Sequence, residues 1–256
     1  HNIDEIQRLD VTIGETVIIE KAGDIITKVV SVMSSLRPND ARKISLPTEC
    51  PICGSPVVRR AGEVAIYCTN KKCFAKEKEA VIHFVSKKAF DIDGLGEKIV
   101  EQLINEKLIA SSADLFLLKP GDLEPLERFA EKSAANLVAA IEEKKSVEFS
   151  RFLYALGIRH VGEQTAIDLA EHFHSIENIQ AASREELHGV PNIGEVVAQS
   201  IFEYFQDERH RLLINNVFEN GVVIKKVVQQ RVRPFDGKTF VLTGSLQTMT
   251  REEASE

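Results

Sequence analysis

Apolar positions follow two different periods along the chain and divide it into segments of different secondary structure. Residues 1–33 are rich in β-branched side chains, most clearly at 15–20 and 25–32, and the Ala22-Gly23-Asp24 segment between these runs is typical of a turn. We therefore expect β structure here. Because two strands alone are only marginally stable, this part is expected to be the end of a β-barrel that begins upstream. Residues 34–49, with serines, prolines and an asparagine, are predicted to be a connector.

From about residue 80 to about residue 220 the apolar positions recur at helical spacing, as at Ile99, Leu103 and Ile104. Glycines and prolines interrupt this pattern, so several short helices are expected. The interruptions lie at Gly94, Gly96, Pro120-Gly121, Gly157, Gly162, Pro191 and Gly194. After Arg233-Pro234, residues 238–244 are predicted to form a strand that ends in a turn.

All four cysteines lie in one short window, in the pattern Cys50-x2-Cys53-x14-Cys68-x4-Cys73. This clustering indicates one local site rather than a disulfide framework. Two tight turns that each carry two thiolates can supply the four tetrahedral sulfur ligands that Zn²⁺ prefers, and a closed shell of four thiolates makes the ion structural. Gly54 follows the second cysteine and suits a turn with positive φ. The alternative is a set of buried free thiols or a redox pair.

The chain of 256 residues has a formal net charge of −7, which by itself disfavours nucleic acid. The charge is unevenly distributed, however. Residues 42–90 hold 10 basic against 4 acidic residues, whereas residues 91–256 hold 18 against 28. The cysteine-bearing segment is thus basic and is predicted to contact phosphates, although a solvated surface would explain its lysines equally well. An acidic region that binds DNA would have to use locally placed donors rather than bulk positive charge.

Length and termini indicate a piece of a larger protein with two or three small domains. No run approaches the roughly 18 apolar residues of a membrane-spanning helix. The opening residues 1–5 are not a secretory signal and lack an initiator methionine. We therefore expect a fragment of a cytoplasmic protein with no membrane partner.

One pattern occurs four times in the helical region, at residues 94–103, 128–137, 160–169 and 192–201. Each copy has an apolar residue followed by a small one, then Glu and an apolar-faced helix, so one supersecondary unit is predicted to be used four times. The pattern resembles the helix-hairpin-helix motif, apolar-x-Gly-apolar-Gly. A tight turn with little side chain exposes backbone N–H groups beside the positive end of a helix dipole, which suits a phosphate and ignores the base.

The residues expected to contact DNA lie at these turns and on the helices that follow them. They are Gly94, Leu95, Gly96, Lys98, Lys132, Arg159, His160, Gly162, Thr165, Asn192 and Gly194. Contact is expected from the first, third and fourth copies. The second copy has Arg128 and Ala130 at the glycine positions, so it is equally compatible with a packing role, with Lys132 still within reach of a phosphate. A single Gly-x-Gly before a helix is usually a plain cap or loop, but four turns in register favour binding.

The order of these parts resembles the C-terminal portion of the bacterial NAD-dependent DNA ligases. Residues 4–11 and 22–26 are similar to the oligonucleotide-binding (OB) barrel of that family, and residues 50–55 with 68–70 to its four-cysteine zinc finger. Residues 237–254 are similar to the opening of its BRCT domain. Phe74 departs from the family pattern, which often has proline there, without affecting the zinc ligands.

The resemblance implies a multidomain α+β fold with four parts. These are the end of an OB-fold domain with a connector at 1–41, a four-cysteine zinc finger at 42–80, a mostly α-helical domain of four tandem helix-hairpin-helix repeats at 81–230, and a linker with the truncated start of a BRCT domain at 231–256.

The resemblance also implies an enzyme that seals nicks in duplex DNA during replication and repair. Such an enzyme takes AMP from NAD onto the lysine of a Lys-x-Asp-Gly motif and passes it to the 5′-phosphate of the nick. The two Asp-Gly pairs here, Asp93-Gly94 and Asp236-Gly237, have Asp91 and Pro234 at the lysine position. We therefore assign no catalytic residue to this chain, expect the adenylation domain and the NAD and Mg²⁺ sites outside it, and expect the chain alone to be inactive.

The expected partner is double-stranded DNA with a nick, bound independently of sequence by a monomer associated with the bacterial nucleoid. The alternative is a non-enzymatic DNA-junction-binding module or a repair nuclease subunit that uses the same hairpins. An upstream Lys-x-Asp-Gly motif would favour the ligase. A protein-binding scaffold is a third possibility, favoured if salt does not weaken DNA binding.

Overall fold

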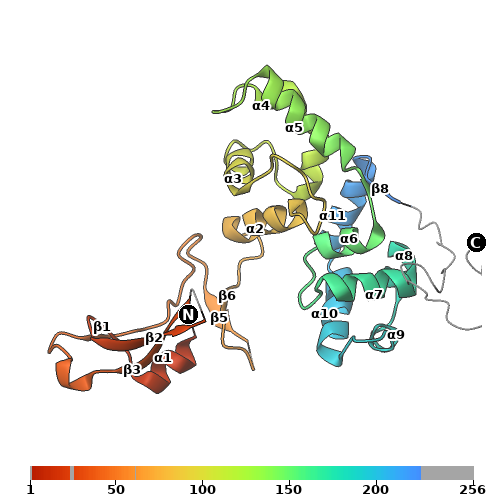
Figure 1. Cartoon of the computed structure of the whole chain (residues 1–256). Coiled ribbons are helices and arrows are strands. Elements are labelled where there is room, and N and C mark those ends of the chain that lie inside the picture. The colour runs from red at the N-terminus through yellow and green to blue at the C-terminus, as the bar shows by residue number, and fades with distance from the viewer. Residues whose placement is uncertain (1, 24–25, 61, 226–256) are drawn as a thin grey trace, which may run out of the picture.

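The computed structural model describes residues 2–23, 26–60 and 62–225. A β-rich N-terminal part, a small cysteine-bearing module and a helical part follow one another along the chain (Figure 1). This mixture of helices and strands matches the predicted multidomain α+β class. The predicted strand at 238–244 and the BRCT start at 231–256 lie outside the described residues.

In the N-terminal part, two antiparallel pairs of strands form, β1 with β4 and β2 with β3, and Val17 lies opposite Val32 in the second pair. Strand β4 and the short 3-10 helix η1 lie within the segment that was predicted to be only a connector. The elements are α1 (Ile3–Leu9), β1 (Thr12–Ile13), β2 (Val17–Ala22), β3 (Ile26–Val32), η1 (Ser34–Leu36) and β4 (Arg42–Lys43).

The opening stretch, predicted to be β structure, begins instead with helix α1, so that part of the prediction is wrong. The Asn2 side chain accepts hydrogen bonds from the backbone N–H groups of Asp4 and Glu5 at 3.1 and 3.3 Å, which caps the helix. Asp10, in the left-handed conformation with φ 52°, ends it. Ile3 is also buried, and Glu5, Gln7 and Arg8 are good helix formers, so the β-branched runs at 15–20 and 25–32 do not extend to this segment.

The cysteine-bearing module contains the antiparallel strands β5 (Val57–Arg59) and β6 (Ile66–Cys68) and leads directly into helix α2 (Phe74–Val85). The boundary predicted between residues 80 and 81 falls within α2. The C-terminal half of this helix packs in the core of the helical part, where Phe84 is almost completely buried. The module and the helical part are therefore joined by one continuous helix.

Four pairs of helices build the helical part: α2 packs on α3, α4 on α5, α6 on α7 and α9 on α10. These pairs are the four predicted repeats. The remaining elements are α3 (Glu97–Asn105), η2 (Ser112–Leu117), α4 (Pro120–Leu123), α5 (Glu131–Glu143), β7 (Ser146–Val147), α6 (Phe149–Ala155), α7 (Glu163–Phe173), α8 (Ile176–Ala181), α9 (Arg184–His188), α10 (Glu195–Gln206), α11 (Glu208–Glu219) and β8 (Val223–Ile224). Strand β7 pairs with β8 in parallel.

Aromatic side chains fill the centre of the helical part. The rings of Phe84 and Phe90 stack with centroids 4.2 Å apart, and those of Phe152 and Phe218 stack at 5.1 Å. Because Phe90 also meets Phe152 edge-on, the rings join helices from the first and third pairs to the last helix α11. Among the described residues, no helix combines the length and apolar character needed to cross a membrane.

Candidate metal centre and nucleic-acid interface

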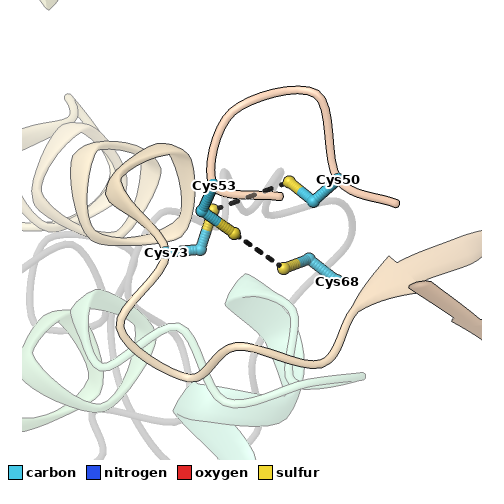
Figure 2. A group of neighbouring side chains, drawn as sticks. All are labelled: Cys50, Cys53, Cys68 and Cys73. Atoms are coloured by element: carbon cyan, nitrogen blue, oxygen red, sulfur yellow. Dashed lines mark hydrogen bonds between the residues drawn. The ribbon is translucent and has the colours of Figure 1, made fainter. Parts of the chain in front are cut away.

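The four cysteines converge on one point (Figure 2). The Sγ atoms of Cys50 and Cys73 lie 3.9 Å apart, those of Cys53 and Cys68 lie 3.5 Å apart, and all four lie within 4.8 Å of one another. No disulfide joins them. Zn–S bonds of about 2.3 Å in a tetrahedron place neighbouring sulfurs about 3.8 Å apart, so the four thiols fit a structural Zn²⁺. The predicted convergence of the four cysteines on one site is confirmed.

Local backbone geometry brings the first two thiols into this position. Gly54 takes φ +69°, as predicted, and its N–H donates to the Cys50 carbonyl at 2.9 Å. Hydrogen bonds from backbone N–H groups within the turn lower the pKa of Cys50, and hydrogen bonds from Ser55 lower the pKa of Cys53 to about 6. Burial raises the pKa of Cys68 to about 11, and a bound cation would favour its ionised form.

The four hairpins share one backbone conformation, although their sequences differ. In each turn the N–H of the fourth residue donates to the carbonyl of the first. The pairs are Leu95 to Ile92 at 3.4 Å, Phe129 to Leu126 at 3.1 Å, Val161 to Ile158 at 3.0 Å and Ile193 to Val190 at 3.2 Å. The third residue has positive φ in all four, with 88° at Gly94, 71° at Arg128, 65° at His160 and 64° at Asn192. A positive φ at this position is typical of a type II turn.

The types of residue found at the third position explain why glycine is not needed there in every turn. His160 and Asn192 are residue types that tolerate this conformation better than most. Arg128 adopts it too, at some cost in conformational energy. The second copy therefore has the same turn as the others, even though its sequence departs most from the pattern.

The residue after each turn is the N-cap of the second helix of the pair. It is Gly96 before α3, Ala130 before α5, Gly162 before α7 and Gly194 before α10. At the three glycines φ is negative, and an added Cβ would meet no atom within 4 Å. The fold itself therefore does not require glycine at these exposed positions. A missing side chain in open space leaves room for a ligand to approach the backbone closely.

Free hydrogen-bond donors accompany these three glycines. Among the described residues, the N–H groups of Gly96, Gly162 and Gly194 have no acceptor, and no side chain caps the helices that follow. In the second copy the Ala130 N–H instead donates to Ser133 Oγ at 2.8 Å. Three of the four turns thus present unpaired N–H groups at a helix N-terminus, whereas the second satisfies its own.

The predicted DNA-contacting side chains differ in how far they are exposed. Lys98, Lys132 and His160 are exposed beside the turns. Leu95 is buried at 5% exposure and its N–H is used within the turn, so it anchors the hairpin rather than facing a ligand. Thr165 is half-buried on the first turn of α7.

Two further predicted residues are held by neighbours. Asn192 donates through Nδ2 to Asp168 at 3.3 Å, which joins the fourth turn to α7. Arg159 pairs through Nη2 with Glu63 of the cysteine-bearing module and donates to Tyr67 Oη at 3.2 Å. No sequence signal pointed to these two partners, because 96 residues separate Glu63 from Arg159.

The cysteine-bearing module contacts both of its neighbours. Arg59 pairs with Asp4 of α1 through two hydrogen bonds, at 2.6 and 3.0 Å. Lys71 lies 3.5 Å from Asp207, the N-cap of α11. Together with the Arg159 contact, these ion pairs place the module between the β-rich part and the helical part.

Three family models match the chain, in the order predicted from the sequence. The model of the NAD-dependent DNA ligase OB-fold domain matches residues 1–41, and that of the NAD-dependent DNA ligase C4 zinc finger domain matches residues 49–75. The model of the helix-hairpin-helix motif matches residues 151–214, which include the third and fourth hairpins.

Proposed function

This chain belongs to the NAD-dependent DNA ligases, and on that premise we propose that it grips nicked duplex DNA while a separate adenylation domain joins the strands. The hairpin turns hold phosphates of the duplex, and the OB-fold part lies along the same duplex. The chain contributes to the rate of sealing by holding the nick in position, because the reaction needs its reacting atoms in near-attack geometry. The zinc finger, stabilised by Zn²⁺ on four thiolates, braces the joint between the two parts.

One observation carries this proposal: three turns with the same hydrogen bond and a positive φ are each followed by an exposed glycine that begins a helix and whose N–H has no acceptor among the described residues. A phosphate oxygen is an acceptor-only anion, so it suits such a donor array. These contacts ignore the base, so binding is independent of sequence. The second turn, whose Ala130 N–H already donates to Ser133, serves mainly in packing.

In this proposal the residues that catalyse sealing lie outside this chain of 256 residues. Neither Asp-Gly pair of the sequence is preceded by lysine at the required position. The adenylated lysine and the NAD and Mg²⁺ sites of the enzyme therefore belong to another part of the protein. On its own the chain should bind nicked DNA and seal none of it.

Adding one methyl group at Gly162 tests the proposal. Ala130 shows that the turn accepts alanine at this position, so Gly162→Ala should leave the fold intact. A hydrogen bond to a charged group contributes about 1.5–3 kcal/mol, so the loss of one should weaken binding at least about tenfold. Fluorescence anisotropy with nicked and intact duplexes measures this affinity.

Gly121→Ala is the matched control, because it also adds a methyl group into open space but lies on α4, away from the turn glycines. It should leave the affinity for DNA unchanged. Wild-type affinity of Gly162→Ala for nicked duplex would contradict the phosphate-binding role of the turns. Equal affinity of the wild-type chain for nicked and intact duplexes would contradict recognition of the nick by this part.

A further inference from the structure

The loop between β5 and β6 reaches the third hairpin turn. Arg159, the second residue of that turn, pairs with Glu63 of the loop and donates to the Tyr67 hydroxyl at 3.2 Å. Its guanidinium also lies over the Tyr67 ring, 5.2 Å from the centroid. Arg60 approaches the same ring at 5.0 Å. An ion pair, a hydrogen bond and a cation–π contact thus fix one arginine side chain.

The hydrogen bonds of Arg159 use a single nitrogen of its guanidinium. Both hydrogen bonds use Nη2, and among the described residues Nε and Nη1 have no acceptor. The side chain remains 35% exposed. Because a guanidinium carries five N–H donors in a rigid plane, holding Nη2 also fixes the direction of the Nη1 donors. These free donors belong to the turn that directly precedes Gly162, whose N–H has no acceptor among the described residues.

The contacts of Glu63 and Tyr67 with Arg159 are connected to the cysteine cluster. Tyr67 is in β6 immediately before the ligand Cys68, and β6 pairs with β5, where Val58 lies opposite Tyr67. Glu63 lies in the short loop that joins these strands, and the Arg159 hydrogen bond lowers the pKa of Glu63 and keeps it ionised. A continuous set of contacts therefore runs from the cysteine cluster through β6 to Arg159.

We propose that Glu63 and Tyr67 are positioning residues, which hold Arg159 so that the free Nη1 donors of its guanidinium meet a DNA phosphate at the third turn. The inference rests on the proposed function of the turns and deepens it. It gives the zinc finger a specific task in DNA binding, performed through Arg159 rather than through its own lysines.

The direction in which Glu63→Gln changes the affinity for DNA distinguishes this positioning role from simple charge repulsion. Removal of a carboxylate near DNA should raise the affinity, because it reduces repulsion of the phosphates. If Glu63 positions Arg159, Glu63→Gln should instead weaken binding, by about threefold to tenfold, since a neutral amide holds the guanidinium less firmly. Glu49→Gln is the matched control: Glu49 is exposed in the same module and, among the described residues, its side chain makes no hydrogen bond.

The experiment measures the affinity of the zinc-loaded chain for nicked duplex across a range of salt concentrations. Arg159→Ala should weaken binding and reduce the slope of log K against log salt by about 0.9, the value for one phosphate contact. Glu63→Gln and Tyr67→Phe should each weaken binding in the wild-type background. Neither should weaken it further in the Arg159→Ala background, because each acts through that arginine. Glu49→Gln should equal or slightly exceed the wild type.

Tighter or unchanged binding by Glu63→Gln would overturn the inference and would show that Glu63 competes with DNA for Arg159. Additive losses in the double variants would overturn it as well. Zinc content is measured for every variant, and if Glu63→Gln loses metal, Tyr67→Phe decides, since it keeps the ring and removes only the hydroxyl. If Gly162→Ala weakens binding and Glu63→Gln does not, the inference alone fails. If Gly162→Ala has no effect, the proposed function fails.

Discussion

Gly94 and Gly96 lie on either side of one buried residue in the first hairpin turn, and the structure predicts opposite consequences for adding a methyl group to each. Gly94 has φ +88°, and an added Cβ would lie 3.3 Å from Cδ1 of Leu137. Gly96 has φ −72°, and an added Cβ would meet no atom within 4 Å. Gly94→Ala should therefore strain the fold, whereas Gly96→Ala should alter only the outer surface of the turn.

The expected free energies follow from these geometries. A left-handed conformation costs a residue with a side chain about 1–2 kcal/mol. The smaller entropy of alanine in the unfolded chain offsets about 0.4–1 kcal/mol of this, while repulsion from Leu137 adds to it. Gly94→Ala should therefore destabilise the helical part by at least about 1 kcal/mol. For Gly96→Ala the same entropic gain offsets the poorer capping by alanine, so the change should stay within about 0.5 kcal/mol.

Thermal unfolding of the zinc-loaded chain, followed by far-ultraviolet circular dichroism, measures the difference. Since about 1 kcal/mol lowers the Tm of a domain of this size by about 2–4 °C, Gly94→Ala should melt clearly below the wild type. Gly96→Ala should melt with the wild type but bind nicked duplex about tenfold more weakly. Equal losses of Tm in the two variants would refute the assignment of Gly94 to the fold and Gly96 to the ligand.

Two further predictions concern the metal and the response to pH. Cys68→Ser should lower both the zinc content and the Tm, because three thiolates no longer close the shell; metal analysis that finds full occupancy would contradict the site. Burial lowers the pKa of His210, whose Nδ1 donates to the Tyr204 carbonyl at 3.0 Å. The unfolded chain therefore binds a proton at His210 before the folded chain does, and stability should fall as the pH drops below about 6.5. His210→Gln should reduce this loss in urea unfolding, and an unaltered pH dependence would exclude His210 as its source.

The repeat was predictable from the sequence because the same positions of every copy are buried. Three of the four copies have alanine at the seventh position, at Ala134, Ala166 and Ala198, and all three are almost completely buried. The first copy has Val100 there, equally buried. Burial at fixed spacing on one helix face is a local property, and sequence periodicity reports it directly. The cysteine cluster was predictable for a similar reason, since its spacing alone indicates paired knuckles.

Helix α1 had a local signal that the prediction passed over in favour of the β-branched runs after it, since Asn2 caps the helix and Glu5 follows three residues later. Other features depend on contacts that no local pattern contains. Strand β4 forms only by pairing with β1, where Thr12 lies opposite Lys43. The partner of Arg159 lies 96 residues away, and many exposed acidic residues are equally plausible partners in the sequence. Such contacts are set by the packing of whole elements rather than by the residues that make them.

The charge distribution and the turn geometry indicate that residues 42–90 and residues 91–256 contribute to DNA binding in different ways. Oriented N–H groups act over a short range and carry no net charge, so they cannot draw a duplex towards residues 91–256, where acidic residues outnumber basic ones by 28 to 18. Residues 42–90, with 10 basic against 4 acidic residues, can do so, because net positive charge steers phosphate-rich partners. We infer that residues 42–90, which include the zinc finger, supply the long-range attraction and that the turns fix the position of the duplex. The Arg159 contact joins the two, because it ties the finger to one of the turns that it serves.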